Sequence, residues 1–293
     1  MSSGQPLPAP FRAFEAQRAF FRKSAISMIA GPPGSMKTML TLNIVDRIRV
    51  PTLYFSNDSD DYTVATRVLA MKAGVPMSET EQWTKTHVEY ATAQLQSFDH
   101  VKWSFHPAPT MEHIEREMDA FAEIRGDYPE HTVIDIMMNV DYDGVGEQNY
   151  WGLMNELHYL SRKWNTALTV VHHTSEAVKG EPCPPRHAIM GKANQLPVLI
   201  LTLNGRPDAI DVAVVKNRFG PSDLTGRTSF PLQAEPWCSR VIEDEDASQP
   251  NEPGLPAGRV DAGPGDGTGG LFAKHVPQDS GSEHPGPGTD QVV

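Results

Sequence analysis

A segment rich in glycine and proline carries the residue types that bind the phosphates of a nucleotide. Residues 27–41 read SMIAGPPGSMKTMLT, an apolar run, a loop, and Lys-Thr at the start of a segment with helical periodicity. Phosphate binding needs inward-pointing backbone N–H groups at a helix N-terminus, a lysine for the β and γ phosphates, and a hydroxyl on Mg²⁺. We therefore expect a phosphate loop for ATP and Mg²⁺. Its members are Gly31, Pro32, Pro33, Gly34, Ser35, Met36, Lys37 and Thr38.

One position of this loop departs from the pattern GxxxxGK[ST], because Met36 stands where the pattern has glycine. If the backbone requires a positive φ there, methionine carries a steric cost, whereas a helical conformation just before Lys37 would accept it. The plain alternative for the whole segment is a Gly-Pro turn that joins a strand to a helix.

Acidic residues follow two other apolar runs. Asp135 ends the run HTVID, where a carboxylate suits magnesium and its water in the manner of a Walker B aspartate, together with the Thr38 hydroxyl. Asp58 follows the run LYFSN and suits the activation of the attacking water, with Asp60 or Asp61 as substitutes. The alternatives are a strand-ending aspartate without a ligand and a solvated acidic turn.

These residues need a scaffold of strands, and the chain alternates apolar runs with segments of helical period. That alternation is typical of parallel strands joined by crossover helices. The expected strands are 25–30, 51–56, 101–105, 132–136, 167–172, 196–203 and 210–216. A helix is expected over 111–124 with Thr110 as its N-cap, and another carries Leu153, Leu157, Leu160 and Trp164 on one stripe. Residues 76–100 are expected to be helical with polar loops.

Composition divides the 293 residues into three parts, with an N-terminal arm or linker helix over 1–21 and the α/β domain over 22–242. Residues 243–293 are rich in Gly and Pro and hold ten acidic and two basic residues, so they carry −8 of the net charge of −12. Such a segment cannot bury enough apolar surface to offset its ordering entropy, and we expect a disordered acidic tail. The rest of the chain carries a net charge of only −4, which is compatible with a local basic surface that binds nucleic acid.

Two classes of protein have no support in the sequence. Cys183 and Cys238 lie far apart outside any CxxC or CxxxH pattern, which argues against a disulfide framework and a zinc site. No run approaches the 18 or so apolar residues that span a bilayer, so we expect a cytoplasmic protein without a membrane partner.

The end of the second expected strand resembles a known family. Phe55, Ser56, Asn57 and Asp58, with Arg67 in the next helix, resemble the DnaB-like replicative helicases, whose RecA-like motor has a catalytic glutamate at the place of Asp58. The resemblance covers roughly residues 22–234. It implies a RecA-like P-loop core with a mostly parallel twisted sheet flanked by helices. It also makes segment 11–21 a remnant linker helix that packs on a neighbouring subunit.

Further roles are implied by the same resemblance. Hexameric helicases and RepA-type replication ATPases place a γ-phosphate sensor at the strand end occupied by His172 and His173. His173 is favoured because neighbouring strand residues face opposite sides, which leaves His172 packed. The loop after this strand would grip single-stranded DNA through Lys179, Arg186 and Lys192, and an ordinary solvated loop is the alternative.

The last expected strand ends at Lys216, and Arg218 follows two residues later. On strand geometry the two cations should point to the same side. In DnaB-like helicases such a pair reaches the γ-phosphate held by the adjacent subunit, which implies a homo-oligomer in the form of a hexameric ring. A solvent-facing strand end is the plain alternative.

The resemblance implies an ATP-dependent DNA helicase or translocase that acts in DNA replication and is phage- or plasmid-like. The protein would consist of the motor domain alone, and its tail would bind a replication protein. One rival is a RecA- or RadA-like recombinase, although no Phe-x-x-Ala motif occurs in the N-terminal segment. The other rival is a regulatory or loader ATPase that binds protein.

Overall fold

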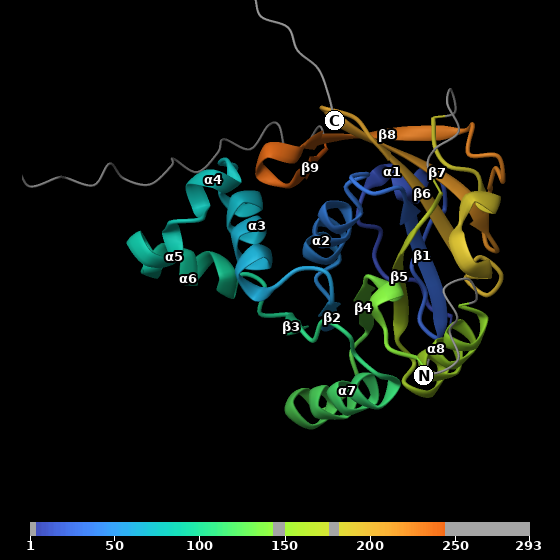
Figure 1. Ribbon diagram of the computed structural model, residues 1–293, viewed down its shortest axis with the longest axis horizontal. Helices are drawn as coiled ribbons and strands as arrows, with labels where there is room; N and C mark the ends of the chain where they lie inside the picture. The colour runs from blue at the N-terminus through green and yellow to red at the C-terminus, as the bar shows by residue number, and fades with distance from the viewer. Residues whose placement is uncertain (1–3, 143–149, 176–181, 244–293) are drawn as a thin grey trace, which may run out of the picture. The chain divides into compact units, whose positions relative to one another are not determined.

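The computed structural model describes residues 4–142, 150–175 and 182–243, and within them the strands form a nine-stranded sheet (Figure 1). The strand order is β3-β2-β4-β5-β1-β6-β7-β8-β9. Neighbours from β3 to β6 are parallel, and β7, β8 and β9 are each antiparallel to the strand before. The strands are β1 Ala25–Gly31, β2 Thr52–Ser56, β3 Val101–Ser104, β4 His131–Asp135, β5 Ala167–His173, β6 Leu199–Gly205, β7 Ala209–Asn217, β8 Ser229–Glu235 and β9 Arg240–Ile242.

Helices cover both faces of the sheet. The strand β1 shows why, since Ile26 and Met28 belong to the core under α7 and α8, whereas Ile29 belongs to the core under α2. Two-sided burial of this kind is what parallel strands require. The helices are α1 Arg12–Ala16, α2 Lys37–Ile48, α3 Asp61–Ala73, α4 Met77–Thr80, α5 Trp83–Thr86, α6 Val88–Gln96, α7 Met111–Arg125 and α8 Trp151–Lys163. The short 3-10 turns are η1 Met137–Asn139, η2 Arg186–Ala188, η3 Met190–Lys192 and η4 Pro236–Cys238.

All seven strands expected from the sequence lie in the sheet, and the helices expected over 111–124 and around Leu157 are α7 and α8. Thr110 caps α7, because its hydroxyl accepts a hydrogen bond from the His113 N–H at 3.1 Å. The strands β8 and β9 were not expected. Pro231 breaks the strand pattern of β8, yet it is tolerated because β9 pairs only with the last three residues of β8.

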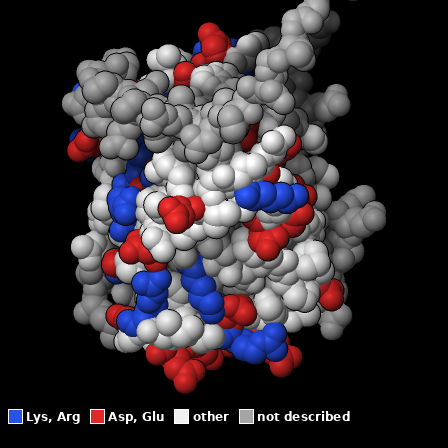
Figure 2. Space-filling model, turned by 90° about the vertical axis from the view of Figure 1, so that its left-hand side faces the viewer, with Lys and Arg blue, Asp and Glu red and all other residues white. Residues whose placement is uncertain are grey.

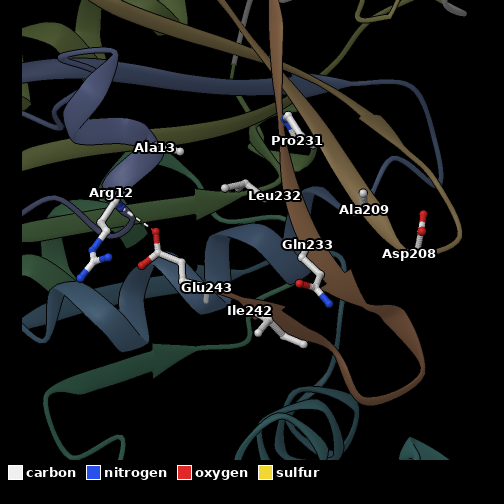
Figure 3. Close-up of a pocket in the computed structure, with 9 residues that line it drawn as sticks. All are labelled: Arg12, Ala13, Asp208, Ala209, Pro231, Leu232, Gln233, Ile242 and Glu243. Carbon is white, nitrogen blue, oxygen red and sulfur yellow. Dashed lines mark hydrogen bonds between the residues drawn. The ribbon is translucent and has the colours of Figure 1, made fainter. Parts of the chain in front are cut away.

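The N-terminal segment differs from the expected linker helix. Only Arg12–Ala16 is helical, and Phe11, Phe14 and Phe21 are buried in this chain's own core, so their side chains are not available to a neighbouring subunit. The Arg12 backbone N–H donates to Glu243 Oε1 at 2.7 Å, beside a cavity of about 440 Å³ (Figure 3). The segment is therefore integrated into the domain.

Asn43 joins α2 to the last strand. Its Nδ2 donates to the Ser239 carbonyl and its Oδ1 accepts from the Val241 N–H, each at 2.9 Å. The side chain is buried, and it satisfies one backbone group of the three-residue strand β9 and one of Ser239, the residue just before that strand. Asn43 thereby fixes β9 against the helix that begins at Lys37.

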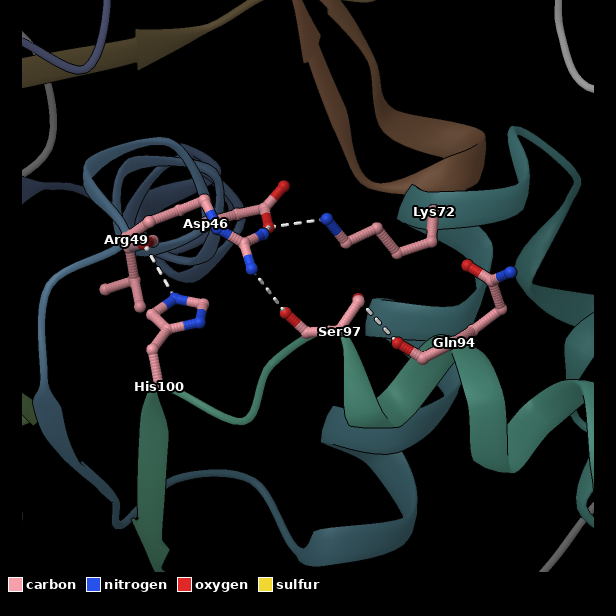
Figure 4. A network of polar contacts seen from close by, with 7 residues as sticks. Asp46, Arg49, Lys72, Gln94, Ser97 and His100 are labelled. Atoms are coloured by element: carbon pink, nitrogen blue, oxygen red, sulfur yellow. Dashed lines mark hydrogen bonds and ion pairs between the residues drawn. The ribbon is translucent and has the colours of Figure 1, made fainter. Parts of the chain in front are cut away.

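A polar network holds α2 against its other neighbours (Figure 4). Asp46 pairs with Lys72 of α3 at 2.5 Å, and Arg49 donates to the Ser97 carbonyl at 3.2 Å. His100 lies just before β3, and its Nε2 donates to the Val45 carbonyl at 3.2 Å. These contacts all lie near the C-terminal end of α2. No helix in the described part of the chain combines the length and apolarity needed to cross a bilayer.

Candidate nucleotide site

The loop between β1 and α2 lies at the carboxyl edge of the parallel strands, where ligands bind in open α/β sheets. Gly31 is required by close packing, because a Cβ there would collide with the Ser35 side chain and lie 3.1 Å from the Leu203 carbonyl oxygen. Gly34 has a φ of +77°, which favours glycine.

Met36 adopts the left-handed conformation, with φ 65° and ψ 27°. The position therefore needs the positive φ for which the common pattern uses glycine, and a methionine there costs roughly 1–2 kcal/mol. Its side chain packs beside β6, since a Cβ at Gly205 would lie 3.4 Å from Met36 Cε.

Lys37 is 8% exposed and folds back on the loop. Its Nζ donates to the carbonyl oxygens of Gly31 at 3.0 Å and Pro32 at 2.8 Å. Burial lowers the pKa of Lys37, and the nearby carboxylates of Asp135 and Asp58 oppose that shift. A cation with two acidic neighbours thus lies at the start of α2.

Asp135 ends β4 at 4% exposure, and its Oδ2 accepts a hydrogen bond from the Tyr54 hydroxyl at 2.7 Å. Burial raises the pKa of Asp135, while hydrogen bonds from Tyr54 and Thr38 act in the opposite direction. A hydroxyl beside a carboxylate is the oxygen donor set that magnesium uses together with substrate phosphates. No cluster of three or more His, Cys, Asp or Glu suited to a metal occurs among the described residues.

The structure separates the three aspartates that follow β2. Asp58 is exposed and lines the cavity beside Lys37 and Asp135. Asp60 caps α3, because its carboxylate accepts a hydrogen bond from the Thr63 N–H at 2.7 Å. Hydrogen bonding with Thr63 lowers the pKa of Asp60. Asp61 accepts from the Tyr62 N–H and lines a different groove beside β3. Asp58 is therefore the carboxylate of the three that faces the cavity.

The cavity has a volume of about 380 Å³ and joins the loop to distant parts of the chain. Arg67, which the family resemblance had marked, is in its wall. Met77, Pro236 and Ser239 also line it and carry no sequence signal, because they come from short elements at α4, η4 and the turn before β9. The lining residues are Pro33, Gly34, Met36, Lys37, Thr38, Met39, Asp58, Arg67, Met77, Asp135, Ile136, His173, Pro236 and Ser239.

The two histidines at the end of β5 have different surroundings. His172 is fully buried, its Nε2 donates to the Met190 carbonyl at 3.0 Å, and burial lowers its pKa to about 4. His173 lines the cavity, and its pKa is lowered by burial and then by Lys37. The His173 Nδ1 is buried without a hydrogen-bond partner among the described residues, as is the Ser35 hydroxyl. Of the two residues, His173 lines the cavity, and an unsatisfied buried nitrogen there fits a polar ligand such as a polyphosphate.

Comparison with known proteins agrees with this geometry at the level of the fold. No protein-family model matches the chain. A solved ATPase domain superposes with a TM-score of 0.68 over 82% of this chain and 92% of that one, at 11% identity. A DnaB-like replicative helicase, whose structure was described with its interactions with primase, gives 0.69 over 83% of this chain and 64% of that one, also at 11% identity. The chain has a RecA-like P-loop ATPase fold.

Other similar proteins extend the comparison. The KaiC-like protein PH0186 from Pyrococcus horikoshii OT3 superposes with a TM-score of 0.53 at 9% identity. The superposition covers 80% of this chain and 96% of that protein. In sequence, the Gene 65 protein of Mycobacterium phage L5 is 29% identical over 243 residues, which are 79% of this chain and 91% of that protein. The Gene 65 protein of Mycobacterium phage D29 is 28% identical over 217 residues, which are 70% of this chain and 94% of that protein.

The pair Lys216 and Arg218 lies near the amino end of the parallel strands, opposite the end that carries the loop. The strand β7 runs antiparallel to β6, so Lys216 pairs with Ile200 near the start of β6, whereas Gly205 at its end touches the loop. A strand of this length spans about 20 Å. The pair therefore cannot reach phosphates bound at the loop of the same chain.

Lys216 is half-buried and donates to the carbonyls of Asn194 at 3.2 Å and Gln195 at 2.6 Å. Burial lowers its pKa to about 8, with further contributions from the charges of Arg186 and Arg218. The structure thus brings Arg186, expected on a DNA-binding loop, into the electrostatic surroundings of the Lys216–Arg218 pair. This basic group of three is defined by Arg186, Lys216 and Arg218.

Two other residues were expected to bind DNA, Lys179 and Lys192. Lys192 is exposed on η3, and Lys179 lies outside the described residues, as does the expected acidic tail after Glu243. On the face in Figure 2, basic and acidic side chains are interspersed among the coloured atoms, and they form no broad basic track there. Charge alone therefore does not mark that face for nucleic acid.

Proposed function

We propose that this chain is an ATP-driven helicase or translocase that acts on single-stranded DNA in replication and works as a homo-oligomeric ring, hexameric in the family it resembles. The observation that carries the proposal is the separation of two half-sites. One half-site lies at the carboxyl end of the parallel strands and consists of Lys37, Asp58, Asp135 and His173. The basic group lies at the opposite end of these strands. Head-to-tail contact between copies would join the halves, and rotation that closes gives a ring.

Each residue then has a role in hydrolysis. Lys37 would exchange the carbonyls of Gly31 and Pro32 for the β and γ phosphates, and Thr38 and Asp135 would hold the metal. Magnesium, when bound, neutralises developing charge on the phosphates. Asp58 orients the attacking water and accepts its proton.

The remaining roles concern the γ-phosphate and its surroundings. His173 contacts the γ-phosphate from the end of β5, and Arg218 with Lys216 neutralises charge on the γ-phosphate of the adjacent copy. The resemblance to DnaB-like helicases and the mycobacteriophage relatives support a phage replication setting in the host cytoplasm. A replication protein that binds residues 243–293 belongs to the same proposal.

DNA would be held by Lys179, Arg186 and Lys192, of which Arg186 and Lys192 lie among the described residues. The test is ATP hydrolysis with and without single-stranded DNA, with Lys37→Ala as the matched inactive control. We expect at least several-fold stimulation of the wild type by DNA and background hydrolysis by the variant. Unstimulated hydrolysis would favour a loader that binds protein, and strand exchange between homologous DNAs would favour a recombinase.

A further inference from the structure

Tyr54 lies deep in the domain and its hydroxyl contacts one residue of the candidate site. It is on β2 directly opposite Val133 of β4, and Val133 shares a sheet face with Asp135 two residues later. The Tyr54 side chain is 1% exposed, and its hydroxyl donates to Asp135 Oδ2 at 2.7 Å. The hydrogen bond therefore spans two strands inside the core.

The ring of Tyr54 is held by packing, so the direction of its hydroxyl is fixed. The Trp103 ring lies on one side with its centroid 4.9 Å away, and Leu42 of α2 belongs to the same buried cluster. A phenylalanine would fill this space equally well. A buried tyrosine hydroxyl needs a partner, and here that partner is the carboxylate expected to bind magnesium.

We propose that Tyr54 is a positioning residue that holds the Asp135 carboxylate in one orientation toward the magnesium of the nucleotide. One carboxylate oxygen accepts the tyrosine hydrogen bond, and the remaining acceptor positions serve Thr38 and the metal. Hydrogen bonds of this kind orient metal ligands and their loss weakens metal binding. The inference rests on the proposed ATPase function.

The test is Tyr54→Phe, which removes the hydroxyl and keeps the ring. The matched control is Tyr128→Phe, because the Tyr128 hydroxyl also donates to an aspartate, Asp119, at 2.9 Å, on the exposed surface of α7. The readout is the rise in melting temperature that ADP produces, titrated with Mg²⁺. We expect Tyr54→Phe to raise the half-saturating Mg²⁺ concentration about ten-fold. The control should leave it unchanged.

A second readout separates positioning from stability. Binding of a fluorescent ADP analogue at 20 °C should be unchanged in Tyr54→Phe without Mg²⁺ and weaker with limiting Mg²⁺. A general loss of stability would lower the melting temperature at every Mg²⁺ concentration and leave the half-saturating value unchanged. Equal Mg²⁺ dependence in Tyr54→Phe and the wild type would overturn the inference. If the wild type itself shows no effect of nucleotide with Mg²⁺, the proposed ATPase function fails instead.

Discussion

At the scale of single residues, the backbone of Met36 leads to a test of local strain. Its φ of 65° is a conformation that glycine adopts without a Cβ penalty. We expect Met36→Gly to be more stable than Met36→Ala by about 1 kcal/mol, because both lose the side chain and only alanine keeps the penalty. Urea unfolding of the two variants measures the difference. A more stable alanine variant would contradict the left-handed assignment.

Lys216 gives a prediction in pH. Burial and its cationic neighbours lower its pKa to about 8, so the charge is lost as the pH rises through that value. If this charge acts on phosphate, kcat/KM for ATP should fall above about pH 8, since kcat/KM reports the free enzyme. Lys216→Arg keeps its charge and should remove the fall. Identical alkaline limbs in both proteins would assign the titration to another group.

At the scale of secondary-structure elements, His131 makes the junction of β4 and β5 sensitive to acid. It is fully buried, its Nε2 lies 2.9 Å from Thr169 Oγ1, and burial lowers its pKa to about 3. The native histidine stays neutral, while the unfolded chain binds a proton below pH 6.5, so the free energy of unfolding falls as the pH falls. The loss at pH 5.5 should be about 1 kcal/mol for this residue.

His131→Gln tests this loss, because glutamine can hydrogen-bond and does not titrate. Urea unfolding at pH 7.5 and 5.5 should show a smaller acid loss in the variant, with part of the loss remaining because the pKa of His172 is also lowered to about 4. The same loss in both proteins would mean that His131 is already protonated in the folded state.

The elements also show what a sequence can predict. Strand periodicity was enough to predict the parallel part of the sheet. The loop and the acids at strand ends were enough to predict which side chains lie near Lys37. The cavity wall at Met77, Pro236 and Ser239 was not predictable, because short elements without periodicity reach it through packing between distant segments. The surroundings of Arg186 were missed for a similar reason, since they depend on how a loop lies along β7.

At the scale of the whole molecule, the two half-sites predict complementation between inactive variants. Arg218→Ala should keep nucleotide binding and lose turnover by about three orders of magnitude or more, and Lys37→Ala should also be inactive. In an equal mixture, an interface can pair an intact loop with an intact arginine, and random assembly makes about a quarter of interfaces complete. Steady-state ATPase activity of the mixture measures this recovery.

The control for that mixture replaces Lys37→Ala with the double variant Lys37→Ala/Arg218→Ala, which supplies no intact arginine. This mixture should remain inactive. Full activity of Arg218→Ala alone would remove the shared-site mechanism.

The Asn43 clamp between α2 and β9 has a mechanical consequence. Residues 244–293 continue the chain from Glu243, so tension on that segment is transmitted to β9. Asn43 holds the Ser239 carbonyl and the Val241 N–H, and the load therefore passes into α2. That helix begins at Lys37, and Ser239 is itself in the cavity wall. A protein that pulls on the segment after Glu243 would exert force on the nucleotide cavity without touching it.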